Sequence, residues 1–256
     1  MIRNVTGLTT LVKRELVRFL VVSSQTILPP LISTTLFLLI FGLSVGRNID
    51  FTQHAVRYLE FIVPGLVTMS LISSAYENTS SSLFISRWHN HIQEVLLSPL
   101  SYFEMVLGLL AGGVARGIIV ALGVFAVSLL FTPVDIMHPL LLLYFMLSIS
   151  VIFSAAGLIA ALWADNFGML SLWNVYVITP AVFLGGVFHP VEMMPESLRF
   201  LAQFNPMHYL VSGVRYACLG IEESAVGVSI FLSLALALLT FSFTVHLFRI
   251  GYKLRT

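Results

Sequence analysis

The sequence predicts an all-α, polytopic membrane protein that forms a single domain over residues 1–256. Of these residues 58% are hydrophobic and only 10% are charged, whereas roughly a quarter of a soluble domain is charged. Six apolar segments are also long enough to cross a bilayer, which takes about 20 residues per helix. Beside these six transmembrane helices, we expect an N-terminal interfacial helix, a short cytoplasmic helix and two extracellular re-entrant helices between spans five and six.

The six predicted spans follow from the lengths of the apolar runs. They cover Thr26–Val45, Leu59–Thr79, Phe103–Phe131, Pro139–Trp163, Gly168–Val187 and Ala225–Phe248. Paired prolines at Pro29-Pro30, together with Pro64 and Pro180, interrupt spans one, two and five. Such breaks either kink a span and help to shape a cavity, or simply mark a helix start.

The distribution of basic residues predicts the orientation, because cytoplasmic loops are enriched in Lys and Arg. With the N-terminus inside, eight basic residues fall on the cytoplasmic side and four outside. Both termini are therefore expected in the cytoplasm. The inside set is Arg3, Lys13, Arg14, Arg18, Arg87, Arg249, Lys253 and Arg255, and the outside set is Arg47, Arg57, Arg199 and Arg215.

Residues 5–22 precede the first span and have helical amphipathicity. Apolar side chains share one face, and three basic residues fall off it: Lys13, Arg14 and Arg18. This pattern predicts a helix on the cytoplasmic leaflet with its basic side toward anionic lipid headgroups. The alternative is an ordinary polar lead-in to a membrane helix.

The loop between spans two and three, Ser80–Glu104, contains a second amphipathic stretch over residues 82–99. One face can rest on the membrane domain while the other meets a soluble partner, or the helix merely lies in the membrane interface. His89 and His91 are two residues apart and point to different sides of a helix, so no metal site is expected there.

The stretch between Gly185 and Tyr216 is apolar but too interrupted to cross a bilayer. Pro190, Pro195 and Pro206 each start or stop a helix, because proline lacks a backbone donor and clashes with the preceding turn. Helices are predicted to begin at Pro195-Glu196 and at Asn205-Pro206, with Asn205 as the N-cap. The re-entrant segment is expected over residues 188–220.

Arg116 is the one formal charge deep in a predicted span. An arginine at mid-bilayer needs a protein or water partner, and Glu77 in span two is the nearest candidate. The alternatives are that Arg116 snorkels or that span three starts further into the cytoplasm. Small residues around Arg116 and in span four predict close helix packing: Gly108, Gly112, Gly113, Gly117, Ala156, Ala160 and Ala164.

Several function classes are excluded or weakened by missing features. The two lysines lack the glycines of a phosphate-binding loop, so this chain is not expected to hydrolyse ATP. No catalytic residues and no metal ligands are predicted, and the net charge of +1 gives no reason to expect a nucleic-acid partner. An integral membrane lipid-modifying enzyme would need clustered carboxylates and histidines, and a secondary transporter would need coupled ionisable groups at the midplane.

Five stretches, in order along nearly the whole chain, resemble the membrane subunit (permease) of ABC-2 type ABC transporters. The resemblance is nearest to the YadH-like, nodulation-factor and drug-exporter permease group. The matching stretches are QTILPPLISTTLFLLIFG (Gln25–Gly42), FIVPGL (Phe61–Leu66), IQEVLLSPLS (Ile92–Ser101), GGVARG (Gly112–Gly117), and GGVFHPVEMMP with FNPMHYLVSGVRY (Gly185–Tyr216).

The resemblance implies a homodimer in a bacterial or archaeal cytoplasmic (inner) membrane, in contact with membrane lipids and with two copies of a P-loop ABC ATPase. That partner would bind ATP and Mg, and this chain would bind no cofactor. Residues 82–99 would form the coupling helix, with contacts from Arg87, Trp88, His91 and Glu94. The cargo would be amphipathic, lipid-linked or drug-like. Pathway residues are expected in spans two and five: Met69, Ser73, Tyr76, Trp173, Tyr176 and Phe183.

Overall fold

The computed structural model describes residues 4–41 and 56–254, and over these residues it contains helices and no strands. Six helical segments within them are long and apolar enough to cross a membrane, in agreement with the predicted fold class. They are α2 (Ser23–Ile40), α3 (Tyr58–Trp88), α5 (Tyr102–Ser128), α6 (Pro139–Trp163), the run Phe167–Leu184 and α11 (Val226–Ile250). The end predicted for span one, beyond residue 41, lies outside the described residues.

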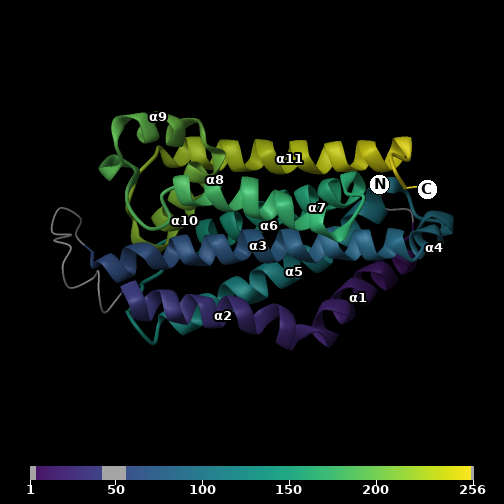
Figure 1. Cartoon of the computed structure of the whole chain (residues 1–256), viewed down its shortest axis with the longest axis horizontal. Coiled ribbons are helices and arrows are strands. Elements are labelled where there is room, and N and C mark those ends of the chain that lie inside the picture. The colour runs from purple at the N-terminus through teal and green to yellow at the C-terminus, as the bar shows by residue number, and fades with distance from the viewer. Residues whose placement is uncertain (1–3, 42–55, 255–256) are drawn as a thin grey trace.

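The helices form an elongated bundle with two different ends (Figure 1). One end carries the short helix α4 (Ile92–Leu97), the start of α1 (Val5–Val21) and the last turn of α11. The opposite end carries α9 (Glu196–Phe204) and α10 (Pro206–Leu219).

Helices α3, α5 and α6 form the centre of the bundle, and most of their residues are buried. Glycines allow this close approach. A Cβ at Gly117 would lie 3.1 Å from the Cβ of Ala75, and one at Gly157 would lie 2.5 Å from the carbonyl oxygen of Tyr76. The predicted packing role of the glycines in span three is therefore confirmed, and Gly157 in α6 plays the same part.

Helix α1 packs against α5, and its buried face contains Glu15 as well as Leu8, Leu11 and Phe19. The prediction that Arg18 faces lipid headgroups is wrong. Its guanidinium turns inward and donates to the Glu15 carboxylate at 3.2 Å and to the side-chain oxygen of Asn78 at 3.0 Å. A buried carboxylate needs a charged partner, which explains why the Arg18 guanidinium turns toward Glu15 while its side chain stays partly exposed.

The coupling segment is divided differently from the prediction. Helix α3 continues without a break to Trp88, and a turn through Asn90, at φ 61°, separates it from α4. The single helix expected over residues 82–99 is therefore the last turns of a membrane-spanning helix followed by a separate short helix.

Prolines in the spans lie inside helices. Pro29, Pro30 and Pro64 are interior residues of α2 and α3, so the helix-start alternative is wrong for them. Span five is interrupted as expected: α7 (Phe167–Leu172) leads into the π-helix η2 (Trp173–Ile178), and α8 (Thr179–Leu184) follows with Pro180 in its first turn.

The segment before α11 has the predicted helix starts. Helix α9 begins after Pro195, and α10 begins at Pro206 with Asn205 as its N-cap, whose side chain accepts a hydrogen bond from the Met207 amide at 3.0 Å. That these helices dip into the membrane stays a prediction.

Arg215 of α10 is fully buried and joins this segment to α3. It forms an ion pair with Glu223 and donates to the carbonyl oxygens of Gly186 at 2.7 Å and Phe61 at 3.3 Å. Its guanidinium carbon also lies 3.8 Å from the centre of the Phe61 ring. The distribution of basic residues placed Arg215 in the outside set, and the structure shows that its ion-pair partner is Glu223.

The packing of α6 on α3 predicts that Gly157→Ala destabilises the protein. The new Cβ would collide with the backbone of Tyr76, so the helices must separate, at a cost of roughly 1–3 kcal/mol for overpacking. Thermal unfolding of the purified protein in detergent measures the effect.

Gly227→Ala is the matched control, since nothing lies within 4 Å of the Cβ that it would add. This variant should melt at or slightly above the parent, because alanine favours a helix over glycine. Equal melting temperatures for the two variants would contradict the packing assigned to Gly157.

Candidate functional site

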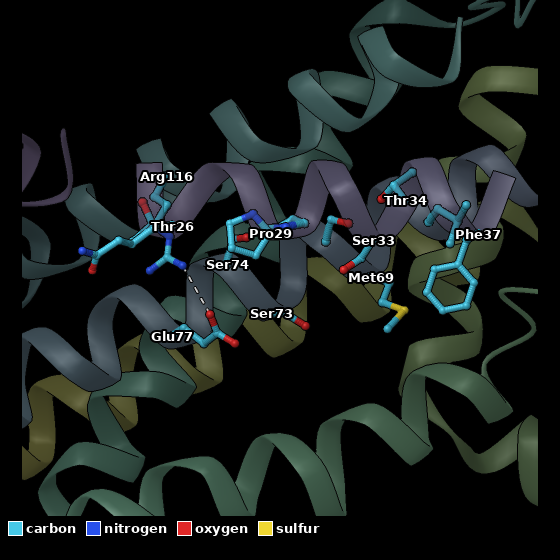
Figure 2. A pocket seen from close by; sticks show the side chains of 14 residues that line it. Thr26, Pro29, Ser33, Thr34, Phe37, Met69, Ser73, Ser74, Glu77 and Arg116 are labelled. Carbon is cyan, nitrogen blue, oxygen red and sulfur yellow. Dashed lines mark hydrogen bonds and ion pairs between the residues drawn. The ribbon is translucent and has the colours of Figure 1, made fainter. Parts of the chain in front are cut away.

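A cavity of about 280 Å³ lies between α2 and α3, with Arg116 of α5 at its edge (Figure 2). Nine of its fourteen lining residues are polar or charged, although it lies among helices that can span a membrane. The lining residues include Gln25, Thr26, Pro29, Ser33, Phe37, Met69, Ser70, Ser73, Glu77 and Arg116. Figure 2 shows the charged side chains at one end of the cavity and Met69 and Phe37 toward the other.

The charged end is the ion pair predicted from the sequence. The Nη2 atom of Arg116 lies 3.3 Å from Oε2 of Glu77. The Arg116 side chain is only 8% exposed, while that of Glu77 is 50% exposed. Glu77 lies about 16 Å along α3 from Trp88, at 1.5 Å per residue, so a half-exposed carboxyl group is held well inside the bundle.

Asn174 of η2 bonds to the second oxygen of the same carboxylate. Its side-chain amide donates to Oε1 of Glu77 at 3.1 Å. One carboxylate thus joins α3, α5 and η2. We did not predict this contact from the sequence, although an asparagine within an apolar span is itself a signal of an internal polar partner.

Most of α3 is buried, but one line of residues along it is open. Met69, Ser70, Ser73 and Glu77 follow one another at helical spacing and are all partly or fully exposed. Neighbouring helices of the same chain cover the rest of this part of α3. The open line is therefore the part of this stretch of α3 that the other described helices do not enclose.

The prolines of α2 contribute to the polar character of the cavity. Because proline has no N–H, Pro29 and Pro30 remove the helical hydrogen bonds to the carbonyls of Gln25 and Thr26. Both of these residues line the cavity. Backbone oxygens without a helical partner are tolerated at membrane depth where they line a water-filled cavity.

The predicted pathway residues separate into three groups. Met69 and Ser73 line the α2–α3 cavity. Tyr76 and Trp173 instead line a second, apolar cavity on the other side of α3. Tyr176 and Phe183 are exposed, by 72% and 41%, and line neither cavity.

The predicted coupling residues do not all face outward. Arg87 donates to the carbonyl oxygens of Ala161 and Leu162 at the C-terminal end of α6. A positive charge at this end of a helix interacts favourably with the helix dipole. Trp88, His91 and Glu94 are exposed. Glu94 also borders a groove of about 500 Å³ between α4 and the first turns of α1.

Known proteins are similar to this chain in sequence. Residues 6–219 match the ABC-2 type transporter family. The chain is 38% identical to the inner membrane transport permease YadH of Escherichia coli K12 over 210 residues, 82% of each chain. It is 24% identical to nodulation protein J of Rhizobium leguminosarum bv. viciae over 186 residues, 71% of each chain. With a match over most of its length and a membrane-spanning helical bundle around a polar cavity, the chain belongs to the ABC-2 type transporter family.

Proposed function

We propose that this chain is the inner-membrane permease subunit of an ATP-driven exporter, with the energy supplied by a separate ABC ATPase. The observation that carries the proposal is the half-exposed Glu77, paired with Arg116 inside the bundle. A charged residue within a span faces water or protein rather than lipid. In a family of transporters, this favours a cargo path along the open line of α3.

The path would run between α2, α3 and η2, and a second copy of the chain would cover it. The outer helices α2 and η2–α8 leave much of their apolar surface exposed, and a homodimer would bury such a surface. The cavity is charged at one end and apolar near Phe37 and Met69 at the other, which suits an amphipathic cargo.

The end of the bundle with α4 would face the cytoplasm and the ATPase, as the eight-to-four distribution of basic residues favours. Trp88, His91 and Glu94 are exposed there and are the proposed contacts of the coupling region. ATP and Mg would bind to two ATPase copies, and closure of that pair would bias the permease between inward and outward access. Such coupling needs only that ATP bind the closed pair more tightly than the open one.

The two-subunit proposal predicts that the purified chain alone hydrolyses no ATP. Hydrolysis should begin when it is reconstituted with its P-loop ABC ATPase partner. A phosphate-release assay on the chain, the ATPase and the complex measures this. ATP turnover by the chain alone, or failure of the two proteins to associate, would contradict the proposal.

The coupling role predicts that Glu94→Lys weakens ATPase binding. Reversing a charge at a protein interface costs several kcal/mol when like charges meet, and Glu94 is exposed and supports no membrane helix. Pull-down of the ATPase and its stimulated activity provide the readout. Glu196→Lys is the control, because Glu196 is also an exposed glutamate in the first turn of a short helix, at the opposite end of the bundle.

The proposed path predicts that Ser73 is reached by water. In a Cys218→Ser background, Ser73→Cys should react with a small charged methanethiosulfonate at a rate on the order of tenfold above Ser242→Cys, because the reactive thiolate forms only in a polar setting. Ser242 is exposed on α11 but lines neither cavity. Mass spectrometry follows the labelling, and equal rates at the two positions would argue against a hydrated path.

A further inference from the structure

The second cavity is larger than the first and has a different chemical character. Its volume is about 710 Å³, and its walls come from α3, α6, η2 and α11. Apolar side chains dominate the lining: Phe153, Ile159, Val177, Ile178, Phe243 and Leu247. The hydroxyl of Tyr76, which also lines it, is already donated to the carbonyl of Leu170 at 3.0 Å. The interior therefore offers an apolar ligand a fitting volume and few polar partners.

Short side chains on α6 leave this space open. The sequence pattern predicts that Ala156, Ala160 and Ala164 pack against another helix. All three do pack against core residues, and the short side chains of Ala156 and Ala160 also line the cavity. The close contact of α6 with the α3 backbone falls on Gly157. Helix α11 packs on α6, but its residues Phe243 and Ile250 remain about half exposed, so the cavity is accessible from the outer surface of the bundle.

Hydrogen-bond donors surround the mouth of the cavity at the α4 end. Trp163 and Trp173 meet edge to face at 5.9 Å, and Tyr252 and His246 complete the lining. Within residues 4–41 and 56–254, the side chains of these four residues have no hydrogen-bond partner. Tryptophan and tyrosine favour the level of the lipid headgroups, which places this mouth at the membrane surface.

Positive charge lies in the last turn of α11 and just after it, next in sequence to the lining residues Ile250 and Tyr252. Arg249 is exposed and forms no ion pair with any described residue. Lys253 donates to Asp165 at 2.8 Å and to the carbonyl of Trp163 at 3.1 Å. That hydrogen bond, together with the lysine charge, lowers the pKa of the Asp165 carboxyl. The carboxylate is thus neutralised by Lys253, and Arg249 remains available for a ligand.

We propose that this cavity binds an anionic phospholipid from the leaflet at the α4 end. One acyl chain would lie on Ala156 and Ala160 between η2 and α11, and the phosphate would accept hydrogen bonds from Arg249, Tyr252 and the indole N–H groups. An apolar interior with a rim of free donors and a cation is complementary to this lipid class. The site depends only on the chain being embedded in a membrane, not on the direction or cargo of transport.

Tryptophan fluorescence tests the site directly in the full-length protein. The chain has three tryptophans, and Trp88→Phe leaves the two at the cavity mouth. The protein is reconstituted in phosphatidylcholine vesicles that contain increasing amounts of either brominated phosphatidylglycerol or brominated phosphatidylcholine. We expect brominated phosphatidylglycerol to reach half-maximal quenching at about a fivefold lower mole fraction than brominated phosphatidylcholine. A preference of this size corresponds to the attraction of an anionic lipid to one arginine near the membrane surface.

Two further variants distinguish binding of the lipid headgroup from binding of the acyl chain. Arg249→Gln should remove the fivefold preference, and Ala156→Phe should reduce quenching by both lipids because it fills the cavity floor. Leu234→Phe, on an exposed part of α11 outside the cavity, should change neither.

Equal quenching curves for the two lipids, or a preference that survives Arg249→Gln, would overturn the proposal and indicate ordinary boundary lipid. If Ala156→Phe does not fold, Arg249→Gln still tests the proposal. This variant should fold, because Arg249 is exposed and has no described partner.

Discussion

The close approach of α3 to α5 and α6 is the constraint on which the rest of the structure depends. Gly113, Gly117 and Gly157 remove side chains where these helices meet, and so α3 is enclosed along most of its length. Only one line of its surface stays open, and this line carries Ser73 and Glu77. The polar cavity exists because the centre of the bundle is packed tightly and α2 covers the open line incompletely.

Charges inside the bundle are compensated by polar or charged partners within the same chain. Arg116 pairs with Glu77, Glu15 with Arg18 and Ser82, and Arg215 with Glu223. Breaking a buried pair leaves an uncompensated charge, which is strongly destabilising. The same side chains also bond to α3: Arg18 donates to Asn78, Glu15 accepts from Ser82, and Arg215 donates to the carbonyl oxygen of Phe61. Irregular backbone is concentrated in α2 and η2, the outer helices on either side of the open line.

Much of the fold was predictable, because its signals are local. Hydropathy places the spans, and Asn205-Pro206 marks the start of α10 through capping and the fixed φ of proline. The Glu77–Arg116 pair was also predictable, since a lone arginine in a span needs a partner and few acids are available. By contrast, Arg18 and Arg87 were expected at polar surfaces, yet Arg18 binds a buried carboxylate and Arg87 binds the final carbonyls of α6.

The sequence by itself determined which segments are apolar enough to cross a membrane, where α9 and α10 begin and which arginine needs an internal partner. Those properties depend on the hydrophobicity and backbone chemistry of neighbouring residues. Only the tertiary structure decided that Glu77 also meets Asn174, that Arg215 meets Glu223, and that Tyr76 and Trp173 line a cavity apart from that of Ser73. These relations depend on how each helix is rotated and on which glycines its neighbours contact, and that is settled only when the whole bundle packs.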